Sequence, residues 1–287
     1  DRSIRLRRTK APCGDCHGIW HASTASTAST ARHRCDTAAM NWARWAALGS
    51  AVALVQEMPE ESDATKLSAK NFRKRYARKG LPVVMRGSDD GPTFDELGEM
   101  CPDGAMEAYE LHAEGKGWAG FSDAKPCTLN EFVMDESAKY GMGLDLKCFC
   151  PELDVSLPPF LRDDRHRFSE FQRKYWPSLA LGRKHGGTQM HGSDQMLPWW
   201  FKVIAGKVDI RIMRVEEWRP KFATGQNPLI INDPNPDFNG PFDAFDDDEL
   251  NAANVTLYKT IAKAGDWVYA PVGALRATRV VGEEPIV

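Results

Sequence analysis

The sequence predicts a mainly β fold, an antiparallel sandwich or barrel that follows a group of N-terminal helices. Helical patterns end before residue 141, whereas short strand-like runs separated by Gly and Pro dominate from Pro158 onward. One such run, 207–214, places Val208, Ile210 and Ile212 at every second position, which is the period of a half-buried strand. The chain also contains eighteen prolines and nine tryptophans in 287 residues, a composition that favours a loop-rich β protein over a helical bundle.

The first helix is predicted from Ser68 to Gly80. Ser68 is a favourable N-cap, Phe72 and Tyr76 lie four apart on one face, and Gly80 provides a stop. The sequence "LPVVMRG" then predicts a short buried strand that ends at Gly87. Two further helices are predicted in "TFDELGEM" and "TLNEFVMDESAKY".

Strands are predicted over the second half of the chain. Their expected ranges are 178–181, 188–191, 199–205, 207–214 and two more within 255–271, joined around Gly265 and Asp266. Between them, residues 227–250 are rich in Pro, Asn and Asp and end in an acidic run, for which we expect a solvated loop.

Composition sets the general class of the protein. With 42% hydrophobic and 27% charged residues, the chain can build a hydrophobic core. Its net charge of −3 offers no general attraction to nucleic acid, so we expect no nucleic-acid partner.

The first 39 residues differ from the rest, because Ser23–Ala31 is a low-complexity repeat of Ser, Thr and Ala. Such a tract buries too little apolar surface to fold, so we interpret 1–39 as disordered or as non-native sequence. "CGDCH" matches the haem-attachment pattern, and Cys13, Cys16, His33 and Cys35 are zinc-type ligands. We expect neither group there, because no core surrounds the motif.

Residues 40–58 form a hydrophobic segment with two open interpretations. If Met40 is the true start, its apolar run has the length of a signal-peptide core; otherwise the segment is a buried helix. The run is too short for a transmembrane span. A signal peptide would place the protein in the secretory pathway or the ER lumen, where Cys101, Cys127, Cys148 and Cys150 could form disulfides. Otherwise these four residues are small buried hydrophobes.

Five blocks in the remaining sequence resemble the JmjC (Jumonji) cupin family, in particular its phosphatidylserine-receptor-like branch, and they follow the family's order. They are "NFRKRYARKGLPVVMRG", "LPPFLRDD", "LALGRKHGGTQMH", "FKVIAGKVDIRI" and "AGDWVYAPVGA". The resemblance covers about 65–287, within an expected JmjC/cupin-like domain at 62–287. It implies a double-stranded β-helix, also called a cupin or jelly-roll barrel. The implied reaction is oxidation of a protein or small molecule with Fe(II), oxygen and 2-oxoglutarate.

That reaction needs two His and one carboxylate to hold iron, and a cation or hydroxyl to bind the cosubstrate. The resemblance places His191 at the first ligand position and Thr188 at the cosubstrate hydroxyl, with Trp200 in register at the pocket. Ser193 then occupies the carboxylate position. Asp194 follows one residue late and would face away unless a bulge redirects it.

The other two positions also depart from the family pattern. The cosubstrate lysine position is Val208, and the neighbouring Lys207 lies on the opposite face of the expected strand. The second histidine position is Arg276, whose guanidinium has no lone pair to donate to a metal. We therefore expect Arg276 to project into the space of the iron and to bind Asp194 or an anion.

Three functions remain open. A catalytically degenerate JmjC-like domain would bind or scaffold a protein partner without a cofactor. An active oxygenase, a protein hydroxylase or demethylase, would use Fe(II) and 2-oxoglutarate at an atypical site. A small-molecule-binding cupin would take an anionic or sugar-like ligand at the barrel mouth. Because the family continues past the position of Val287, we also expect a fragment, or a barrel edge that another chain covers.

Overall fold

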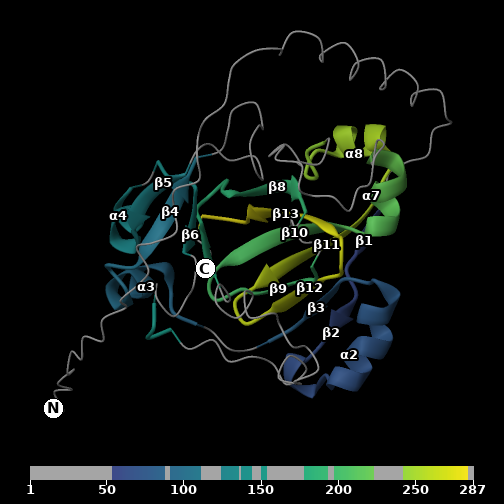
Figure 1. Cartoon of the computed structure of the whole chain (residues 1–287), viewed down its shortest axis with the longest axis horizontal. Coiled ribbons are helices and arrows are strands. Elements are labelled where there is room, and N and C mark those ends of the chain that lie inside the picture. The colour runs from purple at the N-terminus through teal and green to yellow at the C-terminus, as the bar shows by residue number, and fades with distance from the viewer. Residues whose placement is uncertain are drawn as a thin grey trace, which may run out of the picture. The chain divides into compact units, whose positions relative to one another are not determined.

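The computed structural model describes residues 54–87, 91–110, 124–135, 137–143, 150–153, 178–192, 197–222 and 242–283. All of them belong to one compact unit, Ser50–Val287. The unit is mainly β, with mixed and antiparallel sheets and a few short helices, as the sequence predicts (Figure 1). The N-terminal tract, with its haem and zinc motifs, lies outside the described residues.

Three sheets, named A, B and C here, form the described structure. Sheet A contains, in spatial order, β1 (Leu54–Glu57), β11 (Thr256–Lys263), β10 (Lys207–Met213), β13 (Leu275–Val280) and β8 (Gly187–His191). Sheet B contains β2 (Glu60–Glu61), β3 (Val83–Met85), β12 (Trp267–Ala270) and β9 (Trp199–Lys202). Sheet C contains β5 (Lys125–Thr128), β4 (Ala105–Tyr109), β6 (Tyr140–Gly143) and β7 (Leu179–Gly182).

The last six strands pair in a nested order. The innermost pair is β10 with β11, the next is β9 with β12 and the outermost is β8 with β13, and all three pairs are antiparallel. The middle pair lies in sheet B, whereas the other two lie in sheet A. The two strands expected around Gly265 and Asp266 are present as β11 and β12, and the turn between them carries the chain from one sheet to the other.

The main core lies between sheets A and B. Val208, Ile210 and Ile212 of β10 are buried there against Val84 and Val268 of sheet B, as the alternating pattern predicts. The outer face of sheet A packs on α7 (Val215–Phe222) and α8 (Asp247–Ala253) through an apolar cluster that includes Trp218. The outer face of sheet B packs on α2 (Ala69–Arg75).

The three predicted helices are present, and the one N-cap expected from the sequence, Ser68, is confirmed. The Ser68 hydroxyl accepts a hydrogen bond from Asn71 N at the start of α2. A 3₁₀ turn, η2 (Ala77–Lys79), follows α2, and Gly80 ends it with φ of 58°, a left-handed conformation that suits glycine. Both α3 (Phe94–Met100) and α4 (Leu129–Met134) start with capping boxes, at Thr93 and Thr128. Another 3₁₀ turn, η1 (Ala64–Lys66), precedes α2.

The hydrophobic segment 40–58 ends in a strand, which corrects the expectation of a helix for its last residues. β1 (Leu54–Glu57) runs parallel to β11, and Leu54 N donates to Val255 O. The free edge of β11 supplies hydrogen-bond partners that a helix would not use. The folded domain therefore begins before residue 62. In the described part of the chain, no helix has both the length and the apolar character needed to cross a bilayer.

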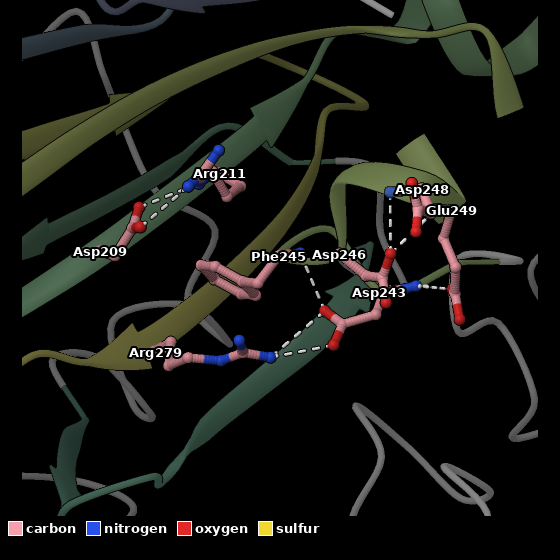
Figure 2. A network of polar contacts seen from close by, with 8 residues as sticks. All are labelled: Asp209, Arg211, Asp243, Phe245, Asp246, Asp248, Glu249 and Arg279. Atoms are coloured by element: carbon pink, nitrogen blue, oxygen red, sulfur yellow. Dashed lines mark hydrogen bonds and ion pairs between the residues drawn. The ribbon is translucent and has the colours of Figure 1, made fainter. Parts of the chain in front are cut away.

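The acidic run is also structured, contrary to the expected solvated loop. Asp246 caps α8 by accepting hydrogen bonds from Asp248 N and Glu249 N, and acidic residues in a first turn favour a helix. Just before α8, Asp243 binds Arg279 of β13. The ring of Phe245 lies beside Arg279, 4.1 Å from its Cζ (Figure 2). Residues 227–241 lie outside the described residues.

A disulfide links Cys101, the C-cap of α3, to Cys150, with 5.4 Å between their Cα atoms. Both residues are buried, and the sulfurs join an apolar cluster beneath sheet C. Closing a loop of 49 residues stabilises a domain by about 4 kcal/mol. Of the other two cysteines in the body, Cys127 is a free thiol and Cys148 lies outside the described residues.

Candidate functional site

The structure brings His191 and Arg276 together. They are direct partners in the register between β8 and β13, and their exposed fractions are 2% and 5%. Their neighbours Met190, Leu275 and Ala277 pack on the outer face of sheet A, beneath α7 and α8. Because side chains alternate along a strand, His191 and Arg276 face inward, toward sheet B.

The Arg276 guanidinium stacks on Trp199. Its Cζ lies 3.6 Å from the centroid of the indole ring, which comes from β9 in the opposite sheet. A cation in contact with an indole face and shielded from water gains about 2 kcal/mol. Arg276 therefore does not extend into bulk solvent, but lies inside the fold at the position where the family resemblance puts a metal ligand.

His191 is held in one tautomer and in its neutral form. Its Nδ1 donates to the carbonyl of Gln189, 2.8 Å away, which leaves the lone pair on Nε2. Burial, assisted by the positive charge of Arg276, lowers the pKa of His191 to about 3. Arg276 is therefore a permanent cation beside an uncharged imidazole.

Two threonine hydroxyls lie next to this pair on the same strands. Thr188 Oγ1 is 3.0 Å from Thr278 Oγ1, and Thr188 N donates to Thr278 Oγ1. A register shift between Arg276 and Thr278 accommodates three residues on β8 against two on β13. This irregularity lets Thr188 and His191 approach the same side of the sheet although they are three residues apart.

Tyr140 is a site residue that the sequence reasoning missed. It lies on β6 in sheet C, is buried, and is close enough for the charge of Arg276 to act on its phenol. Burial raises the pKa of Tyr140 to about 12 even though Arg276 acts in the opposite direction, so the hydroxyl keeps its proton. The sequence predicted a helix over "TLNEFVMDESAKY", with Tyr140 as its last residue, and this is wrong for its end: α4 stops at Met134, and Tyr140 begins β6, a strand with two glycines and no strong alternation.

The structure does not bring two of the expected residues into this site. Trp200 packs against Phe72 of α2 with 4.9 Å between ring centroids, on the outer face of sheet B. The pocket position expected for Trp200 is occupied by Trp199 instead, because adjacent strand residues face opposite ways. Lys207 is exposed on the outer face of sheet A, while its neighbour Val208 is buried inside. It therefore does not join Thr188. Ser193 and Asp194 lie outside the described residues.

No protein-family model matches the chain, and no curated protein matches its sequence. Any function assigned to the site therefore has to rest on its geometry and chemistry.

The described residues do not fit a ferrous site. A facial triad needs two imidazoles and a carboxylate around the metal. Here His191 offers one nitrogen, and its strand partner offers a guanidinium that bears a fixed positive charge. That charge repels a divalent cation at short range. The guanidinium of Arg276 and the protonated hydroxyl of Tyr140 are both hydrogen-bond donors.

Proposed function

We propose that this protein is a jelly-roll domain of the JmjC-like type that has lost iron catalysis and acts by binding an anionic group beside Arg276. The nested pairing of β8–β13 around β9–β12 and β10–β11 supports the jelly-roll assignment, because it is the pattern of a long hairpin rolled into a barrel. The observation that carries the functional proposal is the position of Arg276, buried opposite His191 and stacked on Trp199.

The loss of iron chemistry follows from the charge of the guanidinium. An arginine stays protonated at any pH at which the protein is folded, so it cannot act as a ligand. Its contact with Trp199 also fills space inside the barrel and gives the side chain a stable position without a metal. Oxygen activation and 2-oxoglutarate decarboxylation are therefore not proposed for this chain.

We expect the purified protein, supplied with ferrous ion, 2-oxoglutarate and oxygen, to form no succinate above the level of free iron. Metal analysis after desalting should find far less than one iron per chain. A separate, active 2-oxoglutarate oxygenase, assayed under the same conditions, serves as the positive control. Stoichiometric iron together with succinate formation would contradict the proposal and favour an active oxygenase with an atypical site.

Anion binding is tested with small dicarboxylates and with inorganic phosphate in titration calorimetry. We expect Arg276→Gln to weaken binding at least about tenfold, since a hydrogen bond to a charged group contributes about 1.5–3 kcal/mol. Arg279→Gln is the matched control, because Arg279 lies on the same strand but binds Asp243 on the outer face. If no anion binds the parent protein, or if the two variants weaken binding equally, the anion site is excluded.

The disulfide also bears on localisation. Cys101–Cys150 supports the interpretation that the domain matures in an oxidising compartment such as the ER lumen, because disulfides are rare in the cytosol. This proposal is independent of the anion site.

A further inference from the structure

A group of three potential metal ligands lies at the disulfide, far in sequence from His191 and Arg276. The Sγ atoms of Cys101 and Cys150 and a carboxylate oxygen of Glu152 all lie within 4.8 Å of one another. The Cys101 Sγ is 3.6 Å from Glu152 Oε2. In the disulfide form neither sulfur carries a proton, so this contact gives the carboxylate no hydrogen-bond donor.

Local structure holds the three residues in place. Cys150 and Glu152 share one turn, in which Leu153 N donates to Cys150 O at 3.1 Å. Cys101 ends α3, and its own N–H donates to Leu97 O. The two sulfurs are buried against an apolar cluster, whereas Glu152 is exposed. The group is therefore closed on the protein side and open toward the solvent at Glu152.

We propose that reduction of the Cys101–Cys150 disulfide creates a zinc site formed by the two thiolates and the Glu152 carboxylate. Two sulfurs and one oxygen are ligands that Zn²⁺ accepts in tetrahedral geometry, with a fourth position left to water. Sulfur ligands also select Zn²⁺ over Mg²⁺ and Ca²⁺, which prefer oxygen. The apolar cluster behind the sulfurs leaves the Glu152 side as the approach for the ion and its water.

The chemistry of the switch balances with a thiol reductant. A dithiol transfers two electrons and two protons to the S–S bond and is itself oxidised to a cyclic disulfide, so that Cys101 and Cys150 become thiols. Binding of Zn²⁺ then releases these two protons as the thiols become thiolates. The ion neutralises two of the three negative charges that would otherwise repel one another around Glu152.

The test uses Co²⁺, a coloured substitute for Zn²⁺, in the 287-residue chain. Other thiols of the chain would also bind cobalt, so the background protein carries Ser at five positions: Cys13, Cys16, Cys35, Cys127 and Cys148. After reduction with a dithiol and removal of the dithiol by gel filtration under argon, we expect about one Co²⁺ per chain, with a sulfur-to-cobalt charge-transfer band. The oxidised protein should show no such band, and Zn²⁺ should displace the cobalt.

Two variants separate the proposed site from adventitious thiol binding. Glu152→Gln removes one ligand and leaves the disulfide intact, and we expect it to weaken cobalt binding at least about tenfold. Glu99→Gln is the matched control, because Glu99 is exposed on α3 two residues before Cys101. If the reduced protein binds no cobalt, or if binding is the same in both variants, the proposal is wrong. An unfolded reduced chain would bind cobalt through its thiols alone, and binding would then be equal in the Glu152 and Glu99 variants.

Discussion

Replacing Asp266 with Ala is expected to lower the free energy of unfolding by about 3 kcal/mol, because the change removes the buried acceptor of two backbone N–H groups and one partner of the half-buried Arg86. Asp266 is fully buried, and its Oδ2 lies 2.7 Å from Arg86 Nη1. The same carboxylate accepts hydrogen bonds from Gly87 N and from Lys263 N. The substitution would leave these donors without their acceptor at the turn that carries the chain from sheet A to sheet B.

Urea denaturation of the purified variant measures this loss. Asp266→Asn should recover part of the stability, since its amide oxygen accepts a hydrogen bond but carries no charge. Glu57→Ala is the matched control: Glu57 pairs with Lys259 at the surface, where both side chains are exposed and an ion pair contributes about 0–1 kcal/mol. Equal losses of unfolding free energy in the Asp266 and Glu57 variants would contradict the prediction.

Acidification is expected to destabilise the protein through His191. Its pKa is lowered from 6.5 to about 3 in the folded state, so the unfolded chain takes up the proton more readily. The contribution of His191 to stability is therefore fully present above about pH 6.5 and is lost as the pH falls toward 3. Between about pH 7 and pH 4 this single group accounts for about 3 kcal/mol.

Comparison with His191→Gln isolates this contribution from those of the carboxylates. We expect the stability advantage of the parent protein over the variant to shrink by about 3 kcal/mol from pH 7 to pH 4, measured by urea denaturation at each pH. His185→Asn is the control, because His185 is exposed on a turn with φ of 65°, a conformation that Asn tolerates. An advantage that stays constant with pH would mean that His191 is not neutral and buried as described.

The helices and strands that were predicted correctly depend on residues that are close together in the sequence. Ser68 and Gly80 bound the first helical region because capping depends on a few neighbouring backbone groups. The alternation in β10 identified the buried face because a two-residue period reflects burial on one side. The same reasoning put Lys207 on the face opposite Val208, which is what the structure shows.

Elements that depend on distant partners were missed. β4 and β6 are short, and their pairing in sheet C joins residues 31 to 35 positions apart in the chain. The strand β1 exists because β11 offers it a free edge, although its sequence belongs to a longer apolar run. The first turn of α8 is formed by an acidic segment that Asp246 caps and that Asp243 attaches to β13 through Arg279.

By itself, the sequence determined the mainly β class, the two ends of the first helical region, and the chemical fact that an arginine stands where the family resemblance implies a histidine. Only the tertiary structure decided what that arginine does. The register of β8 and β13 sets Arg276 beside His191, and the packing of sheet B on sheet A brings Trp199, not Trp200, against its guanidinium. The physical reason is that side-chain identity is local, whereas burial and contact across two sheets depend on strands far apart in the chain.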